Sequence, residues 1–397
     1  MYFLIFNCGT DSLRFIISDT QNNLLKGNFE NMSTTSSSLS IKSIYGKQSE
    51  YQGMGVTSIE EATNIIFNEI VSKKYNVLNS INDIGIVGHR VVHGGLEFTN
   101  PKFLNQQDIN KIKSLSNLDP LHNSKIAKLI QLCYELYNRD NYKNAGVFDT
   151  AFHRTLDKSK YLYPINLDDS NQYNIRKYGF HGISCQSVLR QIKDRLNVSA
   201  NDLNLIICHL GGGCSITLVQ KGVSVDTTMG ISPLDGLMMS TRSGCVDPSI
   251  IPTLMREKHL TIEQAIEYLN FECGFKGFTG TGDIKTVCDM DDAGDVNAKL
   301  ANKLFSEKFK QYLSWYIVQA QKLDAIVITG GMGVRNYRER KNLLSGLEKL
   351  GIEIDQERNL NGNKNFSKIS KDGSLPVIIV KNNEEKEIEQ QICEELL

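Results

Sequence analysis

The stretch YFLIFNCGTDSLRFIIS, residues 2–18, determines the architecture predicted for the first part of this 397-residue chain. An apolar run over residues 2–8 stops at a loop of small and polar residues, Gly9-Thr10-Asp11-Ser12, and a second apolar run follows over residues 13–18. After a polar turn, residues 24–29 form a third run. Short apolar runs separated by turn residues are typical of β-strands. The segment therefore predicts an antiparallel meander that bends first at a small-residue loop.

The same pattern returns in the second half of the chain. Residues 204–210 form an apolar run, Gly211-Gly212-Gly213 interrupts it, and two further runs cover residues 215–219 and 223–227. Two similar meanders predict a duplicated architecture. A third strand and loop are predicted where residues 325–329 precede Gly330-Gly331-Met332-Gly333.

Helical patterns fill the intervals between these strands. A capping-box pattern precedes a helical apolar spacing at Ser58 to Glu61, and another begins at Thr261. Residues 296–323 repeat apolar side chains and predict a long helix that packs into the core. The apolar side chains of this repeat are Leu300, Leu304, Phe305, Tyr312, Leu313, Tyr316 and Ile317. Strands and helices mix throughout, so the predicted fold class is α/β.

Length and composition exclude several classes of protein. A chain of 397 residues is longer than the chains that usually fold around a single hydrophobic core, so its length predicts two domains. The formal net charge of -1 gives no global field that would recruit nucleic acid or a membrane surface. No apolar stretch is long enough to span a bilayer, and the N-terminus is typical of a strand rather than a signal peptide. The nine cysteines are scattered, without a Cys-x-x-Cys pair, which favours a reducing cytoplasm.

The small-residue loops suggest a phosphate-bearing ligand. Such loops let backbone N–H groups approach phosphate closely, and the first loop adds the hydroxyls of Thr10 and Ser12 and the cation of Arg14. A single loop of this kind would indicate no more than a hairpin turn. Three of them favour one phosphate-bearing ligand held between two related domains.

Four segments concentrate polar side chains. They read GHRVVHGG at residues 88–95, VFDTAFH at 147–153, YGFHG at 178–182, and DTTMG..PLDGLMM.TRSG at 226–244. Five of the seven histidines lie in or beside these segments or the glycine loops: His89, His93, His153, His181 and His209. The clustering favours a site, although each histidine taken alone could equally be a buried hydrogen-bonding residue.

Together these segments resemble the acetate kinase family, part of the acetate and sugar kinase, heat-shock ATPase and actin superfamily. The resemblance covers residues 7–385. It implies two α/β domains of duplicated actin-like, ribonuclease H-like topology, with mixed sheets flanked by helices. It further implies that residues 1–150 with 385–397 form an acid- and phosphate-binding domain, and that residues 151–384 form the nucleotide-binding domain.

The resemblance also assigns site residues by their place in the matched motifs. The implied catalytic residues are Arg90, Asp149, His181 and Arg242. The implied acid-binding residues are Arg90, Val92, Leu121, His122, Phe180 and Pro233. The implied nucleotide-binding residues are Asn7, Ser12, Arg14, His209, Gly211, Gly213, Asp283, Ile284, Lys285, Gly330 and Gly331. The implied metal-holding residues are Asn7, Asp149 and Glu384, with Mg²⁺ (or Mn²⁺) as the ion and ATP/ADP as the co-substrate. No nucleic-acid or membrane partner is expected, and the resemblance implies a homodimer acting on acetate and ATP.

The residue types suit transfer of a phosphoryl group to a carboxylate. A carboxylate is already ionised near neutral pH, since its ordinary pKa is ~4, so the reaction needs no general base. The obstacle is the approach of two anions, which we expect Arg90 to relieve at the acid and Arg242 at the transferring phosphoryl group. Two ordinary roles remain open, because Arg90 could pair with a structural carboxylate and Asp149 could cap a helix.

Departures from the family pattern leave alternatives open for the donor and for the acid. The third loop, with Val334 and Arg335, lacks the acidic residue usual in the family and gains a cation, and Lys285 replaces a common arginine, so the nucleoside preference stays open and pyrophosphate is an alternative donor. Gly212 replaces an asparagine, and Asp119 replaces an alanine for no reason apparent from the sequence. The competing hypotheses are a propionate kinase, a sugar or glycerol kinase, and a chaperone or filament protein of the same superfamily.

Overall fold

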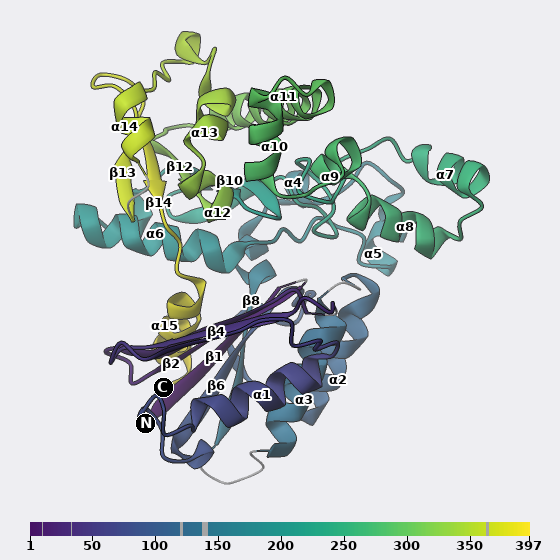
Figure 1. Ribbon diagram of the computed structural model, residues 1–397. Coiled ribbons are helices and arrows are strands. Elements are labelled where there is room, and N and C mark those ends of the chain that lie inside the picture. Colours follow the sequence, from purple (N-terminus) through teal and green to yellow (C-terminus); the bar gives the residue numbers. More distant parts are fainter. Residues whose placement is uncertain (10, 33, 120–121, 137–141, 363–364) are drawn as a thin grey trace. The chain divides into compact units, whose positions relative to one another are not determined.

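The computed structural model describes residues 1–397 except residues 10, 33, 120–121, 137–141 and 363–364. The chain divides into two compact units (Figure 1). Unit 1 comprises Met1–Ala151 together with Asn383–Leu397, and unit 2 comprises Phe152–Asn382. The last helix of the chain therefore belongs to the same unit as its first strand.

Unit 1 is built on an eight-stranded sheet in the order β5-β4-β3-β2-β1-β6-β8-β7. Its strands are β1 (Tyr2–Cys8), β2 (Ser12–Ser18), β3 (Asn23–Glu30), β4 (Ser38–Ser43), β5 (Gln48–Tyr51), β6 (Ile84–Val91), β7 (Lys102–Phe103) and β8 (Lys143–Phe148). The predicted meander is confirmed, because β1 pairs antiparallel with β2 and β2 pairs antiparallel with β3. On its other side β1 runs parallel to β6, and β6 runs parallel to β8.

Helices cover both faces of this sheet. They are α1 (Ile59–Ile70), α2 (Gln106–Ser114), α3 (Asn123–Leu136) and α15 (Glu384–Leu396). Figure 1 shows α15 on one face and the other three on the opposite face. A Cβ added at Gly88 would lie 2.6 Å from Ile5 and 2.7 Å from Ile392, so the glycine lets α15 pack closely over β1 and β6. On β1 and β6, the side chains that point toward α15 are therefore those of every second residue, counted from Ile5 and from Gly88.

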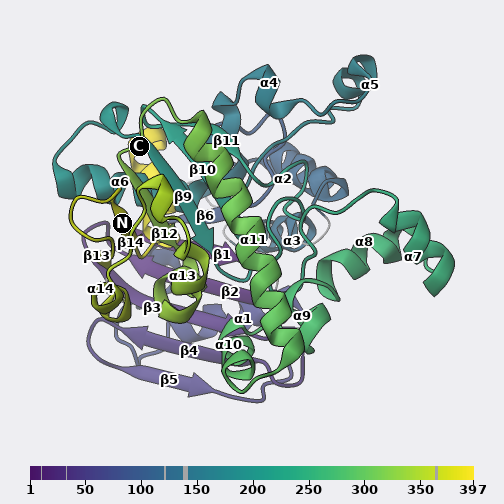
Figure 2. The same cartoon turned by 90° about the horizontal axis from the view of Figure 1, so that it is seen from above.

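Unit 2 is built on a six-stranded sheet in the order β11-β10-β9-β12-β14-β13. Its strands are β9 (Leu205–Leu210), β10 (Cys214–Gln220), β11 (Val223–Thr227), β12 (Ala325–Thr329), β13 (Phe366–Lys368) and β14 (Val377–Val380). Its helices are α4 (Lys158–Tyr161), α5 (Leu167–Gln172), α6 (Gly182–Leu196), α7 (Ile250–Lys258), α8 (Ile262–Phe271), α9 (Gly274–Thr279), α10 (Ile284–Asp292), α11 (Val296–Gln319), α12 (Gly330–Arg335), α13 (Tyr337–Leu344) and α14 (Gln356–Asn361). Figures 1 and 2 show α6 and α11 on opposite faces of this sheet.

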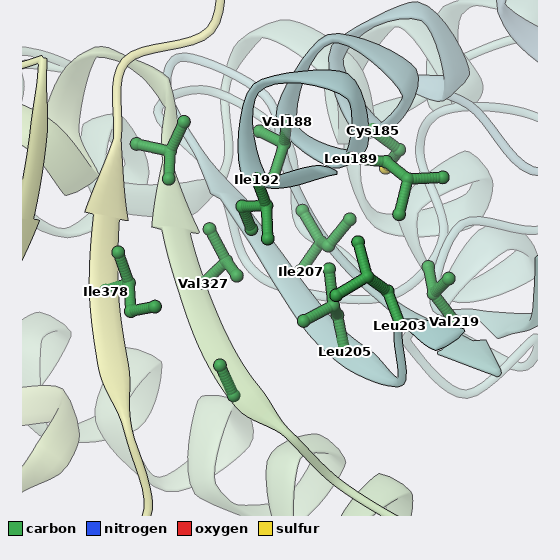
Figure 3. Close-up of a cluster of buried hydrophobic side chains, with 12 residues drawn as sticks. Cys185, Val188, Leu189, Ile192, Leu203, Leu205, Ile207, Val219, Val327 and Ile378 are labelled. Carbon is green, nitrogen blue, oxygen red and sulfur yellow. The ribbon is translucent and has the colours of Figure 1, made fainter. Parts of the chain in front are cut away.

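One hydrophobic core cluster of unit 2 lies between α6 and the sheet (Figure 3). The buried side chains of α6 recur at helical spacing, at Cys185, Val188, Leu189 and Ile192. They meet alternate residues of the central strands, which point to one face of a sheet: Leu205, Ile207, Val219, Val327, Ile378 and Val380. The two periodicities together explain why this helix and this sheet pack against each other.

The duplicated topology is confirmed by strand order. The order β3-β2-β1-β6-β8 in unit 1 matches β11-β10-β9-β12-β14 in unit 2. In both units two antiparallel pairings lead to a strand that is parallel to its next neighbour. The predicted fold class, α/β with two duplicated actin-like, ribonuclease H-like domains, is therefore correct.

One predicted loop is instead a helix. The small residues from Gly330 to Gly333 begin α12 directly after β12. A Cβ at Gly330 would lie 2.4 Å from the Leu210 carbonyl oxygen, and one at Gly333 would lie 2.7 Å from Ile328. These two glycines are thus required for close packing of α12 against β9 and β12. Among the helices of the described residues, none combines the length and the apolar character that a membrane span requires.

Candidate functional site

Three predicted site residues of unit 1 lie where parallel strands end. Asn7 is the penultimate residue of β1, Arg90 is the penultimate residue of β6, and Asp149 directly follows β8. Because parallel strands share one carboxyl edge, the topology brings these three side chains together. Asn7 lies two residues after Ile5 on β1, and Arg90 lies two residues after Gly88 on β6. Because every second side chain of a strand points to the same face, both point toward the face that α15 covers.

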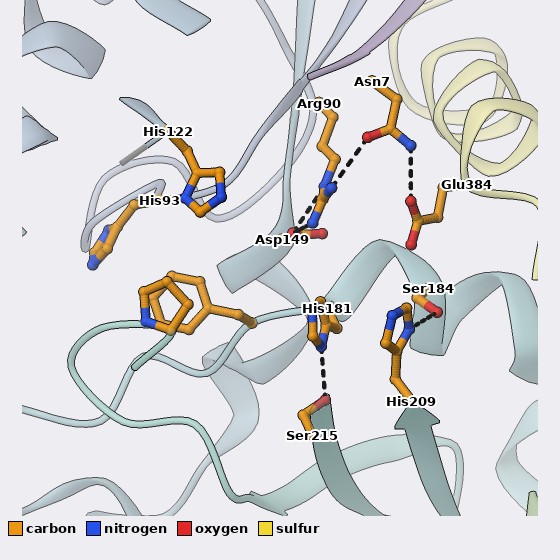
Figure 4. A network of polar contacts seen from close by, with 12 residues as sticks. Asn7, Arg90, His93, His122, Asp149, His181, Ser184, His209, Ser215 and Glu384 are labelled. Atoms are coloured by element: carbon orange, nitrogen blue, oxygen red, sulfur yellow. Dashed lines mark hydrogen bonds and ion pairs between the residues drawn. The ribbon is translucent and has the colours of Figure 1, made fainter. Parts of the chain in front are cut away.

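Arg90 links Asp149 to Asn7 (Figure 4). Its Nη2 and Nε donate to Asp149 Oδ2 at 2.5 and 3.0 Å, and its Nη1 donates to Asn7 Oδ1 at 3.1 Å. Burial alone would lower the pKa of Arg90, but the charges of Asp149, Glu384 and Glu385 outweigh burial and raise it above its ordinary value. Arg90 therefore pairs with a buried carboxylate, which was the structural alternative to a role in binding the acid. The same pairing fixes the direction of its guanidinium.

The start of α15 completes this network. Asn7 Nδ2 donates to Glu384 Oε2 and to Glu385 Oε1, both at 2.8 Å. Arg14, the cross-strand partner of Asn7, forms ion pairs with the same two carboxylates at 3.3 and 3.5 Å. Acidic side chains in the first turn of a helix also interact favourably with its dipole. The network joins the first strand of unit 1 to its last helix.

The oxygen-rich end of unit 1 suits a divalent ion that keeps its water shell. Asp149 is 1% exposed and Glu384 5% exposed, and carboxylates are the ligands that Mg²⁺ prefers. Within the described residues, no group of three His, Cys, Asp or Glu side chains is arranged to hold a metal directly. Asn7 Oδ1 accepts from Arg90, so Asn7 orients its neighbours and would meet an ion through water. The residues fit Mg²⁺ coordinated mainly by water and phosphate oxygens.

A second polar group of unit 1 lies around the start of α3. Asn123 Oδ1 accepts from the backbone N–H of His93 at 3.0 Å, and Asn123 Nδ2 donates to the His93 carbonyl at 2.8 Å. These bonds hold the segment after β6, which carries buried Val92, against the segment that carries His122. His122 Nδ1 contacts both carboxylate oxygens of Asp119, at 2.9 and 3.1 Å. Leu121, also predicted for the acid pocket, lies outside the described residues.

In unit 2, His181 and His209 stack with ring centroids 4.0 Å apart. Figure 4 shows each ring held by a serine, with His181 Nδ1 2.9 Å from Ser215 Oγ and His209 Nδ1 2.8 Å from Ser184 Oγ. Ser184 Oγ also accepts from Asn382 Nδ2 at 2.8 Å, so His209, Ser184 and Asn382 form one chain of hydrogen-bonded side chains.

Both imidazoles face the glycine loop that follows β9. A Cβ added at Gly213 would lie 3.2 Å from His181 Nε2 and 3.4 Å from Arg242 Nη1. A Cβ at Gly211 would lie 3.4 Å from His209 Nε2 and 3.9 Å from the backbone nitrogen of Gly331. Nitrogens of two histidines and one arginine thus surround a loop whose backbone is open to a ligand. Such a set of donors suits an anion with several oxygens.

The backbone at His181 is unusual. Its φ of 60° and ψ of 24° lie in the left-handed region, which a residue with a Cβ rarely adopts. His153 supports the strained segment, because its Nε2 donates to the Phe180 carbonyl at 2.9 Å while its Nδ1 lies 2.8 Å from Ser224 Oγ. Burial lowers the pKa of His153 to about 4, so the ring remains neutral. Stored strain of this kind is concentrated at functional sites.

Comparison with known proteins identifies the family of this chain. The profile of the acetokinase family matches residues 2–390. The acetate kinase of Borrelia hermsii (strain HS1 / DAH) is 37% identical over 392 residues, covering 97% of this chain and 95% of that protein. The acetate kinase of Carboxydothermus hydrogenoformans is 34% identical over 396 residues, covering 99% of both chains.

Solved structures are similar over the same length. A propionate kinase from Francisella tularensis subsp. tularensis SCHU S4 has a TM-score of 0.89 at 34% identity and covers 98% of both chains. Porphyromonas gingivalis acetate kinase has a TM-score of 0.87 at 30% identity and covers 100% of both chains. The chain belongs to the acetokinase family. It is therefore a kinase of the kind that transfers a phosphoryl group to a carboxylate, which argues against an alcohol kinase, a chaperone or a filament protein.

Several further predicted residues of this acetokinase-family chain have structural tasks in unit 2. Asp283 caps α10, where its carboxylate accepts from Thr286 N at 3.1 Å and Thr286 Oγ1 at 2.6 Å, and these bonds lower its pKa. Ile284 is buried and Lys285 is exposed on the same helix. Pro233 is buried, and its carbonyl accepts from Arg242 Nη1 at 3.2 Å, which links a predicted acid-pocket residue to a predicted catalytic one.

The sequence did not reveal several supporting residues. Ser184, Ser215 and Asn382 orient the two histidines, and Glu385 shares Asn7 with Glu384. Position relative to a motif was the only available signal, since Ser184 follows YGFHG and Ser215 follows the glycine loop. Of the clustered histidines, His89 is an ordinary core residue. It stacks on Phe6 at 5.9 Å, contacts Asn144 at 2.8 Å, and has its pKa lowered by burial to about 4.

Proposed function

We propose that this chain catalyses the reversible transfer of a phosphoryl group from ATP to acetate, giving acetyl phosphate and ADP. The observation that carries the proposal is the convergence of His181, His209 and Arg242 on the glycine loop of unit 2. Phosphoryl transfer needs little covalent chemistry from the protein and depends on positioning and on stabilising negative charge. These residues supply hydrogen-bond donors and a positive charge at one backbone loop.

The roles of the side chains follow from their contacts. Arg90, directed by Asp149, would neutralise the carboxylate of the acid. Arg242, held by the Pro233 carbonyl, would balance the charge that builds up on the transferring group, and His181 would donate to one of its oxygens. His122, Val92, Leu121, Phe180 and Pro233 would surround the acid. The acid attacks as an anion, so no residue is needed as a general base.

A divalent ion and the two units complete the proposal. Mg²⁺, or Mn²⁺ in its place, would neutralise the phosphate charges and would be held through water by Asp149 and Glu384, with Asn7 orienting them. Residues 1–150 with 385–397 would bind the acid and residues 151–384 the nucleotide. Ser12, Arg14, His209, Gly211, Gly213, Asp283, Ile284, Lys285, Gly330 and Gly331 would contact the nucleotide or its phosphates. The support is the family match together with the two polar clusters, one in each unit.

The proposal is tested by trapping the acyl phosphate with hydroxylamine. Purified protein is incubated with Mg²⁺ and each pairing of a donor (ATP, GTP or pyrophosphate) with an acid (acetate, propionate or butyrate). We expect acetyl hydroxamate with ATP and acetate, and loss of the signal on adding a chelator. Absence of any hydroxamate from folded protein would contradict the proposal.

Propionate is the second candidate acid, because one similar solved structure is a propionate kinase. One methylene contributes only about 1–3 kcal/mol in an apolar pocket, so a small change in shape alters the preference. Val92 is 3% exposed in the segment held by Asn123. We expect Val92→Ala to raise the propionate-to-acetate ratio of kcat/KM by about 10-fold. An unchanged ratio would remove Val92 from the proposed pocket.

The altered third loop concerns the phosphoryl donor. Arg335 folds back over the start of α12, where its Nε donates to the Gly331 carbonyl at 3.3 Å. This places a cation beside the glycines that would hold the nucleotide. Activity with pyrophosphate alone would mean that this loop no longer selects a nucleoside.

We also propose a homodimer in a reducing cytoplasm. The family resemblance supports the dimer, and the scattered buried cysteines support the compartment. Burial raises the pKa of thiols such as Cys8 to about 11, which makes them unreactive. Sedimentation velocity of the purified protein tests the dimer, and a monomer at micromolar concentration would contradict it.

A further inference from the structure

The Asp119 carboxylate is fully buried, and within the described residues its hydrogen bonds and its ion pair are with His122 alone. Burying a carboxylate is costly unless it is paired and hydrogen-bonded, and a single imidazole is a sparse partner. His122 is itself only 6% exposed. Burying this pair therefore costs folding free energy. A small apolar residue at position 119 would avoid that cost.

The geometry determines which ring nitrogen carries a proton. A carboxylate can only accept hydrogen bonds, so His122 Nδ1, 2.9 and 3.1 Å from the two oxygens, must be the donor. Two contacts from one ring atom to both oxygens place the carboxylate in line with the Nδ1–H bond. The ring is thereby fixed in rotation, and Nε2 becomes the atom that is presented on the other side.

The surroundings indicate where Nε2 acts. Asn123, the next residue, holds the His93 backbone through two hydrogen bonds, and His93 directly follows Val92, just beyond the end of β6 that carries Arg90. Figure 4 shows the His122 ring in unit 1 between His93 and Arg90. An acid substrate beside Arg90 is an anion, and an anion is best met by an imidazolium N–H. The charge of such an imidazolium would be balanced by Asp119.

We propose that Asp119 is a positioning residue that holds His122 with Nε2 directed at the carboxylate of the acid substrate. The inference rests on the proposed function, since it assumes that an acid binds beside Arg90. It predicts that Asp119 affects the binding of the acid and has little effect on the binding of the nucleotide. It also predicts that Asp119 acts only through His122.

A double-mutant cycle on the full-length protein tests this dependence. The variants are Asp119→Ala, His122→Gln and the double substitution, each assayed with acetate varied at saturating ATP and with ATP varied at saturating acetate. Glutamine is used at position 122 because its amide can still donate to Asp119 and avoids leaving a buried carboxylate without a partner. Thermal unfolding midpoints are recorded for every variant.

We expect Asp119→Ala to raise KM for acetate by about tenfold, the usual effect of losing one charge-assisted hydrogen bond, while KM for ATP changes by less than about twofold. In the His122→Gln background the same substitution should change KM for acetate by less than about twofold. Asp119→Asn, whose amide oxygen still accepts from Nδ1, should give an intermediate KM and serves as the variant of nearly unchanged size.

Three results would overturn the inference. They are an equal effect of Asp119→Ala in both backgrounds, a KM for acetate that is unchanged or lowered, and a parallel rise in KM for ATP. A wild-type protein that phosphorylates no acid would instead contradict the proposed function itself, and the two failures are therefore distinguishable. If the wild type prefers propionate, the cycle is run with that acid.

Discussion

At the residue scale, the arginines of the two units differ in their surroundings. Arg90 is bound to a buried carboxylate, whereas Arg242 Nη1 donates to the Pro233 carbonyl and would lie 3.4 Å from a Cβ at Gly213. A carbonyl oxygen orients a guanidinium and carries no formal charge of its own. Arg242 is thus directed at the glycine loop, where its positive charge can act on a phosphoryl group.

Replacing Arg242 by alanine should therefore lower kcat by ~10²–10³, the typical loss when one transition-state donor is removed. Acyl hydroxamate formation measures the loss, and the thermal midpoint should stay close to that of the wild type. Arg256→Ala, which removes an exposed arginine from α7 in the same unit, is the matched control and should retain full activity. High activity in the Arg242 variant would mean that this residue does not touch the reacting group.

A second residue-scale prediction concerns Glu339 on α13. It is 1% exposed, Oε1 has no hydrogen-bond partner among the described residues, and Oε2 contacts only the weak donor Cys288 Sγ at 3.8 Å. Burial raises its pKa from 4.5 to about 7. The folded state therefore binds the proton more tightly than the unfolded state. The stability this gives is complete below pH 4.5 and is lost as the pH rises through about 7.

Glu339→Gln stays neutral at every pH and should remove this dependence. We expect the variant to match the wild type near pH 4.5 and to exceed it by about 3 kcal/mol at pH 8. Urea unfolding can be followed by the fluorescence of Trp315, the single tryptophan, which lies on α11 of the same unit. Glu357→Gln, an exposed carboxylate on α14, is the control. A stability difference that does not vary with pH would show that Glu339 is satisfied when ionised.

At the element scale, the sequence patterns predicted where strands lie better than they predicted which side chains are buried. Apolar runs bounded by glycine identified β1, β2, β9, β10 and β12, because a buried strand must be apolar and a tight bend needs a small residue. The same reasoning failed at Leu300, predicted for the core but 45% exposed, since α11 packs along its length with different neighbours. The helix also ends at Gln319, before the predicted limit. Periodicity identifies an apolar face but not how much of it is covered.

The site residues also fall into two groups, those given by the sequence motifs and those found only from side-chain contacts. Arg90, Asp149, His181 and Arg242 came from motif resemblance, which transfers positions without geometry. The links Asn382–Ser184–His209 and Asp119–His122 depend on side-chain contacts, and the first of them joins residues 198 positions apart. No periodicity encodes such contacts. The glycines after β12 show the opposite case, because their sequence suggested a phosphate loop and their surroundings also require a close-packed helix start.

Gly330 tests that packing requirement. Its φ of 81° lies in the left-handed region, and a Cβ would lie 2.4, 2.6 and 2.8 Å from backbone atoms of Leu210, which cannot move aside. Gly330→Ala should therefore destabilise unit 2 by about 3 kcal/mol or more. Gly280→Ala, with φ of 76° and nothing within 4 Å, carries only the backbone strain and should cost about 1 kcal/mol. Trp315 fluorescence in urea measures both, and equal losses would contradict the packing argument.

At the scale of the whole molecule, duplication explains where the side chains proposed for the site lie. In unit 1 the carboxyl ends of β1, β6 and β8 carry Asn7, Arg90 and Asp149. In unit 2, His209 lies at the corresponding end of β9, Gly330 directly follows β12, and Asn382 lies two residues after β14. The same topology therefore presents an acidic, arginine-bearing cluster in one unit and a histidine and glycine cluster in the other. Each cluster therefore has its own chemistry.

Because the two clusters lie in different units, a change in the cluster of unit 1 should affect catalysis more than nucleotide binding. Arg90→Lys tests this expectation. Lysine keeps the positive charge beside buried Asp149, but it cannot reproduce the paired Nε and Nη2 contacts at 3.0 and 2.5 Å. We expect acetyl phosphate formation to fall by ~10² or more, since the direction of the cation is lost. The dissociation constant of ADP, measured by titration calorimetry, should stay within about twofold, because the cluster of His181, His209 and Arg242 belongs to unit 2. A parallel loss of ADP binding in folded protein would mean that Arg90 supports the nucleotide as well as the acid, and its assignment to the acid alone would then be wrong.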